Sequence, residues 1–431
     1  MSHHDDEPDG SAPGRSEPSA RPRGDNNPRF PHPVLFLIVV VAVTLLALAV
    51  HRIEPDQPGA FYTPPSPLPA GAPGTIIASQ PVTGAPTGSQ AWTILYLSTG
   101  LQNQPIAVSG VVFVPTAPAP PSAGGRPVLA WAHPTTGIAP RCAPSLEAAG
   151  GAAAIPGLST FLEAGYVVTA TDYPGLGTAG PHPYLVGQSE GTAVLDSVRA
   201  ARNLQQAGAG SRFAVWGHSQ GGQAALFAGQ LAPTYAPELT LVGVAAAAPA
   251  TDLSALLQKD IGGLAGNVLG SMAVVSWSQV YASEGLQLGQ VVTTAATPEA
   301  RLIADLCIET EAQLVVDLPE AEVLNVTFLA NAPWTTPGWD TQLAVNTPGA
   351  TAIQAPVLIN QGTADTVVWP SVTAAYVKAQ CAAGVDVSER TYPNVTHTDI
   401  AKVSANDAAG WLAARFQGGA APNGCATTAA P

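Results

Sequence analysis

A serine lies at the centre of a short glycine-rich stretch, residues 217–221, which reads G-H-S-Q-G and fits the pattern G-x-S-x-G. An apolar run, residues 213–216, precedes it, and an alanine-rich run, residues 223–228, follows it. This order predicts a strand, a sharp turn with Ser219 at its apex, and a helix. The flanking glycines lack side chains, so that strand and helix can pass closely. A serine held in this way is a candidate nucleophile.

A serine hydroxyl needs a base that takes its proton. His397 is the only histidine after Ser219 in the sequence, and we therefore predict that it is this base. In hydrolases with this turn, the acid that orients the histidine lies between the two in the chain. Asp365 follows a predicted strand at residues 356–360 and fits best, while Asp252, after an earlier predicted strand, is the alternative. The acid would fix the imidazole tautomer and stabilise the imidazolium.

The oxyanion that forms when a serine attacks a carbonyl carbon needs N–H donors. The backbone N–H of Gln220, at the start of the predicted helix, is one candidate. A second donor should come from the loop after the predicted strand at residues 128–132, which holds Thr135 and Thr136 and lacks an H-G-G-G sequence. The sequence does not choose between the two threonines. Residues 172–177 follow another strand and either line the pocket or form a turn.

Strands and helices that could position these residues alternate along the chain. Residues 92–98 and 106–114 are predicted to form a leading hairpin, and residues 183–205 a helix. Further apolar runs predict strands at residues 128–132, 166–171, 213–216, 239–247, 356–360 and 385–391. Such alternation predicts an α/β protein in which helices cover both faces of a mostly parallel central sheet. Together with the turn at Ser219 and the order of the candidate residues, it predicts the α/β-hydrolase fold.

Residues 251–351 interrupt this alternation. They contain helix-like runs at residues 253–257 and 298–318 and a glycine-rich piece at residues 262–270. Because about 100 residues is long for a plain crossover, we predict an inserted helical cap over the carboxyl ends of the strands. Ordinary connections between strands and helices are the alternative.

The N-terminal part of the chain has a different composition. Residues 1–33 are polar and predict a disordered tail, and residues 51–73 form a proline-rich linker to a catalytic domain at residues 74–431. Residues 34–50 are apolar and follow several arginines, which predicts an uncleaved signal anchor with the N-terminus in the cytoplasm. The alternative is a signal peptide that is cleaved after Ala49, and the protein would then be secreted.

Charge and cysteine content exclude several classes of function. The formal net charge is −14, which disfavours nucleic acid as a partner. The four cysteines include no C-x-x-C pair, so no zinc site is expected, and the proposed chemistry needs no cofactor. An even number of cysteines beyond the apolar segment instead predicts two disulfides in an oxidising compartment. From the residues alone, three pairings are possible.

With these residues placed, the chain resembles the secretory lipase family of fungi and actinobacteria. The resemblance covers about residues 92–417. It is carried by residues 132–145 (A-H-P-T-T-G-I-A-P-R-C-A-P-S), 171–187, 217–222 and 362–367 and by the turn at His397.

The resemblance implies hydrolysis of triacylglycerols or shorter acyl esters by a triad of Ser219, Asp365 and His397. It also implies a helical cap over an acyl pocket. The cysteine pairs that it implies are Cys142–Cys307 and Cys381–Cys425.

We therefore expect an extracytoplasmic serine esterase or lipase that works through an acyl-enzyme and contacts the membrane through its N-terminal segment. An acyltransferase or an aminopeptidase with the same triad is one alternative. A non-catalytic lipid-binding module is another, although the presence of all three triad residues disfavours it.

Overall fold

The computed structural model describes residues 57–118, 124–308, 328–422 and 424–426. The predicted tail and the apolar segment at residues 34–50 lie outside the described residues. The chain divides into two units, Met1–Ile53 and Glu54–Pro431, and the second contains every described residue. Among the described residues, no helix combines the length and the apolar character that crossing a membrane requires.

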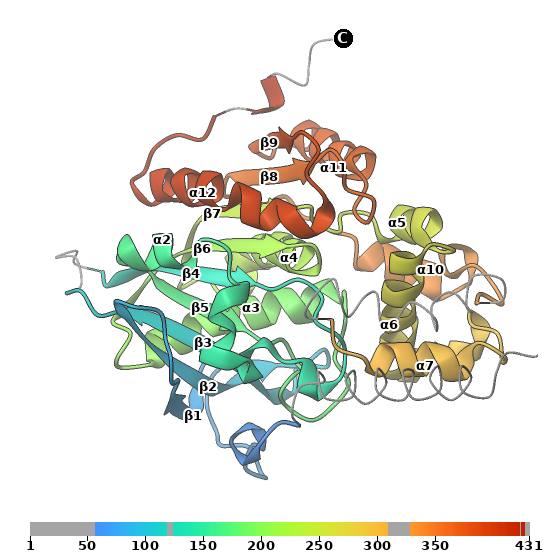
Figure 1. The fold of residues 1–431 in the computed structure, drawn as a ribbon, viewed down its shortest axis with the longest axis horizontal. Coiled ribbons are helices and arrows are strands. Elements are labelled where there is room, and N and C mark those ends of the chain that lie inside the picture. The colour runs from blue at the N-terminus through green and yellow to red at the C-terminus, as the bar shows by residue number, and fades with distance from the viewer. Residues whose placement is uncertain (1–56, 119–123, 309–327, 423, 427–431) are drawn as a thin grey trace, which may run out of the picture. The chain divides into compact units, whose positions relative to one another are not determined.

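A nine-stranded sheet forms the centre of the second unit (Figure 1). Its strands lie in the order β1-β2-β3-β5-β4-β6-β7-β8-β9. The pairs from β1 to β5 are antiparallel, and those from β5 to β9 are parallel. The strands are β1 Ile76–Pro81, β2 Ser89–Thr99, β3 Pro105–Pro115, β4 Arg126–Ala132, β5 Val167–Thr171, β6 Ala209–His218, β7 Thr240–Ala247, β8 Val357–Gly362 and β9 Val387–Tyr392.

Along the chain, the helices lie in the segments that connect the strands and in the segment after β9. The α-helices are α2 Leu158–Glu163, α3 Gly187–Asn203, α4 Gln220–Tyr235, α5 Leu253–Asp260, α6 Leu264–Val280, α7 Thr297–Asp305, α10 Trp339–Val345, α11 Pro370–Ala382 and α12 His397–Phe416. Short 3-10 turns lie at Ala60–Tyr62, Pro140–Cys142, Pro144–Leu146, Ala148–Ala154, Ala282–Glu284, Leu288–Gln290, Pro333–Thr335 and Gly424–Ala426.

The alternation of side chains along the central strands divides the core into two layers. Leu129 and Trp131 of β4 belong to an apolar cluster with residues of α2 and α12. Val128 and Ala130 of the same strand belong to a second cluster with residues of α3 and α4. Successive side chains of a strand point to opposite faces, so the sheet is covered on both. Each fully buried side chain of leucine or valine size stabilises the fold by about 1.5–3 kcal/mol.

The segment between β7 and β8 consists of helices α5, α6, α7 and α10 in its described part. The predicted helix at residues 253–257 extends to Asp260, and the one at residues 298–318 is α7, which ends at Asp305. The part of this prediction at residues 309–318 lies outside the described residues. The glycine-rich piece at residues 262–270 leads into helix α6, which begins at Leu264. A side chain at Gly266 would overlap the backbone of Asp260 at the end of α5. Glycine therefore permits the close approach of these two helices.

Both disulfides of the described residues join the cysteines that the family resemblance implies. Cys142–Cys307 links the loop after β4 to the end of the α7 segment. Cys381–Cys425 links α11 to the C-terminal segment. Beside the first bridge, the backbone N–H of Ile308 donates to the carbonyl of Thr136 at 2.8 Å. The inserted helices are thus connected directly to the loop that holds Thr135 and Thr136.

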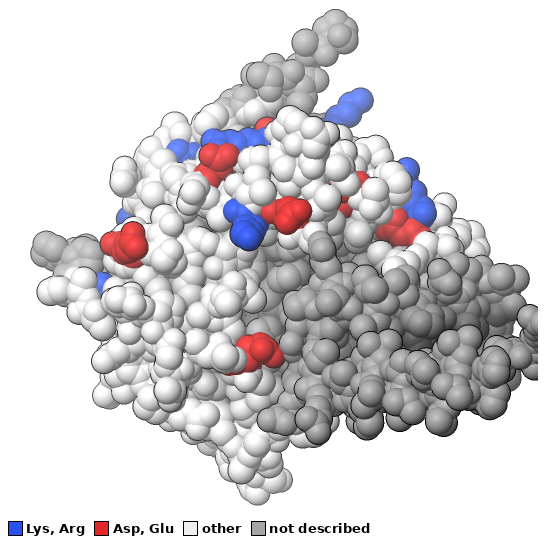
Figure 2. Space-filling model, in the orientation of Figure 1, with Lys and Arg blue, Asp and Glu red and all other residues white. Residues whose placement is uncertain are grey.

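The surface carries few charges, as the 11% content of charged residues implies. Figure 2 shows lysine, arginine, aspartate and glutamate side chains scattered over one face, with acidic and basic groups often near one another. Basic side chains do not gather into a broad patch in this view.

Candidate active site

Ser219 occupies a strained position between β6 and α4. Its φ is 56° and its ψ is −117°, in a region that residues with a Cβ rarely adopt. Its backbone N–H donates to the carbonyl of Ala247 at 2.9 Å, and its own carbonyl accepts from Ala250 at 3.3 Å. These bonds hold the turn against the adjoining strand β7. Strain that is held in place in this way is typical of functional sites.

The glycines on each side of Ser219 allow the backbone to pack at this point. A side chain at Gly217 would overlap the carbonyl of Gly221. One at Gly221 would overlap the backbone of Ala132 and His133, where β4 ends. The first turn of α4 therefore lies directly against the end of β4. This contact brings the N-terminus of α4 beside the loop that contains Thr135.

The structure brings Ser219, Asp365 and His397 together. The two ring nitrogens of His397 each lie 2.8 Å from an oxygen, Nε2 from Ser219 Oγ and Nδ1 from Asp365 Oδ2. An Nδ1–H that donates to the carboxylate leaves Nε2 free to accept the serine proton. The arrangement can therefore activate a serine as a nucleophile.

The carboxylate of Asp365 is fixed from several directions. Its Oδ1 accepts the backbone N–H groups of Val367 and Val368, at 2.9 and 2.8 Å. Its Oδ2, which faces His397, also accepts from Gln361 Nε2 at 3.2 Å. The side chain is buried. These bonds leave the carboxylate one orientation, in which it holds the His397 ring.

His397 begins helix α12, although the sequence indicated only a turn there. A second histidine, His218, holds the backbone at this position. Its Nε2 lies 2.9 Å from the carbonyl oxygen of His397, and the two rings pack with their centroids 4.9 Å apart. Burial lowers the pKa of His218 to about 3, so that the ring is neutral and donates its Nε2–H to the carbonyl. The x positions of the motif vary, so the pattern alone indicates no more than a structural or rim position for His218.

The other candidate acid and the loop after β5 have different roles. Asp252 caps helix α5, since its Oδ1 accepts from the backbone N–H of Ala255 at 2.9 Å. Asp172, in the loop at residues 172–177, is buried and accepts from the Ser109 hydroxyl at 2.6 Å and from the backbone N–H of Ser145 at 2.9 Å. Burial raises the pKa of Asp172 to about 6. Asp172 therefore ties the loops after β4 and β5 to β3.

Thr135 and Thr136 both line one cavity, but only Thr135 also lines the cavity at the serine. Thr135 lines a cavity of ≈ 420 Å³ together with Ser219 and His397. Thr136 lines a neighbouring cavity that includes Asp172 and excludes Ser219. The Thr135 hydroxyl also lies 2.8 Å from the hydroxyl of Tyr184. Of the two threonines, Thr135 is therefore the one that shares a cavity with the serine.

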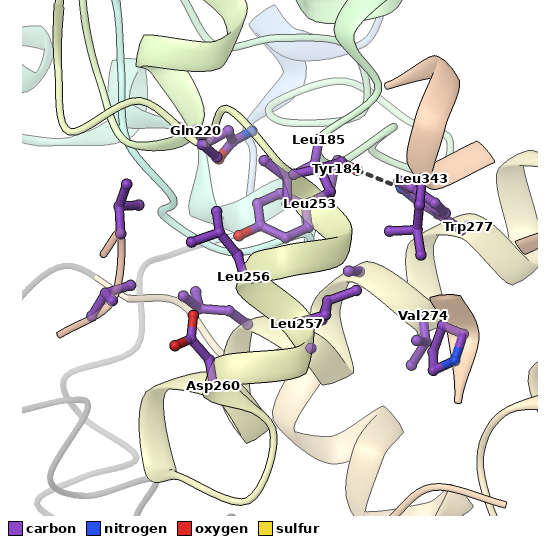
Figure 3. A pocket seen from close by; sticks show the side chains of 18 of the residues that line it. Tyr184, Leu185, Gln220, Leu253, Leu256, Leu257, Asp260, Val274, Trp277 and Leu343 are labelled. Carbon is purple, nitrogen blue, oxygen red and sulfur yellow. Dashed lines mark hydrogen bonds between the residues drawn. The ribbon is translucent and has the colours of Figure 1, made fainter. Parts of the chain in front are cut away.

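Ser219 lies where two cavities meet. One is the ≈ 420 Å³ cavity, which His397 lines with Asp399 and Lys402 of α12. The other is a narrower, mostly apolar pocket of ≈ 70 Å³ (Figure 3). Its walls come from the turn at Ser219 and from the inserted helices, and they include Tyr184, Leu185, Gln220, Leu253, Leu256, Leu257, Asp260, Val274, Trp277 and Leu343. The inserted segment therefore forms much of one side of the site.

Behind the serine, a buried polar cluster holds the side chain of Gln220. Its Nε2 donates to Glu190 Oε1 at 2.7 Å and lies 3.2 Å from His182 Nε2. The same glutamate oxygen accepts the backbone N–H of Leu185 at 2.8 Å. Because His182 Nδ1 lies 2.8 Å from the Pro174 carbonyl and donates to it, its Nε2 can accept from Gln220. The cluster fixes the first residue of α4 and the wall of the apolar pocket at Leu185.

When the pH rises from about 6.5 to 8, we expect the free energy of unfolding to fall less in the Glu190→Gln variant than in the wild type. Burial raises the pKa of Glu190 to about 8, from 4.5. In this range the folded protein holds a proton that the unfolded chain has released, so the free energy of unfolding falls as pH rises. Glutamine has no such proton. Urea unfolding of both proteins at about pH 6.5 and at about pH 8 measures this fall in the free energy of unfolding.

The buried histidines affect stability in a lower pH range than Glu190 does. Burial lowers the pKa values of His133, His182 and His218, so their contribution to stability is lost as pH falls below about 6.5. A Glu238→Gln variant is the control, since Arg199 lowers the pKa of this largely exposed group and its effect lies at acidic pH. Equal pH slopes for the wild type and Glu190→Gln would contradict the expectation.

The other histidines of the described residues, His133 and His182, have structural partners. His133 lies 2.7 Å from the carbonyl of Pro134 and 3.2 Å from that of Asp172. His182 belongs to the cluster behind Gln220. Within the described residues, no three side chains of histidine, cysteine, aspartate or glutamate are grouped so that they could hold a metal ion.

The chain is similar to proteins that are named as lipases. The family model described as secretory lipase matches residues 152–424. A secreted triacylglycerol lipase of Malassezia globosa is 28% identical over 386 residues, which are 83% of this chain and 79% of the relative. A probable inactive lipase of Mycobacterium tuberculosis is 28% identical over 392 residues, 84% of this chain and 82% of the relative.

A solved structure has the same fold. Candida antarctica lipase A in its closed state superposes with a TM-score of 0.71 at 22% identity, over 86% of this chain and 89% of that chain. The predicted α/β-hydrolase fold is confirmed by this likeness and by the mostly parallel sheet. The matching family is the one that the sequence resembles.

Proposed function

Because the chain belongs to the secretory lipase family and is a carboxylic-ester hydrolase, we propose that Ser219, Asp365 and His397 are its catalytic triad. The observation that carries the proposal is the position of the His397 ring, 2.8 Å from Ser219 Oγ on one side and 2.8 Å from Asp365 Oδ2 on the other. The chain order of serine, aspartate and histidine agrees with that of other hydrolases with this fold.

In this mechanism, His397 Nε2 takes the proton of Ser219 while the serine oxygen attacks the ester carbonyl carbon. Asp365 holds the ring and stabilises the imidazolium that forms. His397 then gives the proton to the alcohol oxygen, the bond from the carbonyl carbon to that oxygen breaks, and an acyl-enzyme remains. Water, which His397 deprotonates in turn, attacks the acyl carbon; the bond from that carbon to Ser219 Oγ breaks, His397 returns the proton to Oγ, and the acid is released.

The oxyanion would be held by backbone N–H groups of Gln220 and Thr135. As the first residue of α4, Gln220 has an N–H without an acceptor inside the helix. Thr135 is preferred to Thr136 because it shares a cavity with Ser219 and His397. The contact of α4 with the end of β4 brings these two segments together, which supports the pair.

The direction of proton transfer assigns the two halves of the ester to the two cavities. The leaving alcohol must receive its proton from His397, which lines the ≈ 420 Å³ cavity. The acyl chain would then extend into the apolar pocket, which contains Ser219 and Gln220 but not His397. Helices α5 and α6 of the inserted segment line this pocket, and we propose that residues 251–351 act as a cap over it.

We propose acyl esters with apolar chains, triacylglycerols among them, as the substrates. The apolar walls of the pocket support an alkyl chain, and one relative is named a secreted triacylglycerol lipase. The disulfides and the secreted relatives support a location outside the cytoplasm. Whether residues 34–50 anchor the protein or are cleaved after Ala49 is a prediction from the sequence alone.

Covalent labelling tests the proposal. A fluorophosphonate should react with one serine per molecule, and mass spectrometry should find the label on the peptide that contains Ser219. Labelling should proceed in step with the loss of p-nitrophenyl ester hydrolysis. Stoichiometric labelling of another serine, or full turnover after Ser219 is blocked, would contradict the proposed nucleophile.

A further inference from the structure

One acidic side chain lies in the otherwise mostly apolar pocket next to Ser219. Asp260 is the last residue of α5, and it follows Leu253, Leu256 and Leu257 along the wall that this helix contributes (Figure 3). It is the only titratable acid or base among the residues that line this pocket in the described part of the chain, apart from the hydroxyl of Tyr184. The proposed mechanism gives it no role.

A carboxylate is unfavourable at this position for three reasons. The C-terminal end of a helix carries partial negative charge, so that an anion there is destabilising. The neighbouring side chains are apolar and remove water from the carboxyl group. Nearby Asp365 adds a charge of the same sign; burial, and after it this charge, raises the pKa of Asp260 to about 6, although the hydrogen bond from Trp369 acts to lower it. An apolar residue would meet none of these costs.

The contacts of Asp260 leave one oxygen available. Its Oδ1 accepts from Trp369 Nε1 at 2.6 Å. Among the described residues, no donor lies within hydrogen-bond distance of its Oδ2. Lys259 does not neutralise it by direct contact, because the Lys259 ammonium packs over the Trp369 ring, 4.9 Å from the centroid. This pocket-lining residue therefore has one carboxylate oxygen that the described residues leave without a donor.

We propose that Asp260 is a specificity-determining residue that selects acyl chains bearing a hydroxyl group over plain alkyl chains. The hydroxyl would donate to Oδ2 while the methylene groups contact Leu253, Leu256 and Leu257. A hydroxyl fits better than an ammonium group, because an ammonium loses much more hydration in a small apolar pocket. The inference rests on the proposed assignment of this pocket to the acyl chain.

The test compares matched p-nitrophenyl esters with and without a terminal hydroxyl. The pairs are hexanoate and 6-hydroxyhexanoate, octanoate and 8-hydroxyoctanoate, and decanoate and 10-hydroxydecanoate, which place the hydroxyl at different depths. The measured quantity is the ratio of kcat/KM for the hydroxylated ester to that for the plain ester. At the best chain length, Asp260→Leu should lower this ratio by about tenfold or more, since a hydrogen bond to a charged acceptor is lost.

Further variants separate selection from structural support. Asp260→Asn keeps an oxygen for Trp369 Nε1 and should lower the ratio less. Trp369→Phe removes only that donor and should keep the preference for the hydroxylated ester. Asp252→Asn removes a charge from the other end of α5, outside the pocket, and should leave the ratio unchanged.

The outcomes distinguish this inference from the proposed function. A ratio that is the same in the wild type, Asp260→Leu and Asp260→Asn at every chain length would overturn the role of Asp260, while turnover of the plain esters would still support the hydrolase. A Trp369→Phe ratio that falls as far as that of Asp260→Leu would show that Asp260 acts only as a support. If the wild type hydrolyses none of the esters, the proposed function itself fails.

Discussion

Ser219→Ala should lower kcat for ester hydrolysis by about 10⁶-fold, with an unfolding midpoint close to that of the wild type. The hydroxyl that would attack the carbonyl is removed, and no other hydroxyl of the described residues is bonded to His397 Nε2. Alanine keeps the Cβ, so that the backbone at φ 56° is not changed further. Stopped-flow and long-time assays with a p-nitrophenyl ester cover the required range.

The control is the Ser404→Ala variant, which also loses a buried hydroxyl. Ser404 lies in α12, as His397 does, and its hydroxyl donates to the Ile400 carbonyl at 2.7 Å. Ser404→Ala should cost about 1 kcal/mol of stability or less and leave kcat near the wild-type value. Residual activity of Ser219→Ala within about tenfold of the wild type would remove Ser219 from the nucleophile's role.

Asp365→Asn should lower kcat by about 10⁴-fold and change KM little. The carboxamide presents an N–H toward His397 Nδ1 or loses the backbone donors of Val367 and Val368, and in either case the imidazole is held in the wrong tautomer or orientation. Asp365 lines neither of the two cavities at Ser219, so substrate contacts should persist. Steady-state kinetics with one ester separates the two parameters.

Asp399→Asn is the control for this second prediction. Asp399 lies two residues after His397, lines the ≈ 420 Å³ cavity and accepts from the Thr396 hydroxyl at 2.9 Å. Removing its charge changes the electrostatics near the histidine without touching the proposed triad, and it should have a small effect on kcat. Equal losses in Asp365→Asn and Asp399→Asn would mean that general electrostatics, and not orientation of the ring, explains the effect.

The sequence predicted those parts of the molecule whose patterns are local. The apolar runs marked eight of the nine strands, and the turn at Ser219 with the order of the later aspartate and histidine was sufficient to select three residues that meet in space. The missed strand, β1, has partly exposed side chains and pairs only with β2 at the edge of the sheet. Without a buried face on both sides, it shows no continuous apolar run.

The sequence did not predict contacts between distant segments. His182, Glu190 and Gln220 come from three separate elements, and a glutamate in the first turn of α3 would be expected on the surface. Asp260 likewise stands in no sequence pattern that would mark it as part of a pocket. The place of Asp260 in the pocket depends on how α5 packs against α6 and against the turn at Ser219. No local periodicity specifies this packing.

The Cys142–Cys307 bridge also has a consequence for the protein in a protease-rich environment. It joins residues that are 165 positions apart, and the chain between them includes Ser219 and the helices α5, α6 and α7. A protease that cuts one peptide bond anywhere in this interval leaves two fragments that are still covalently joined. The nucleophile then stays attached to the part that carries Asp365 and His397. A nicked molecule would separate on a gel only after reduction.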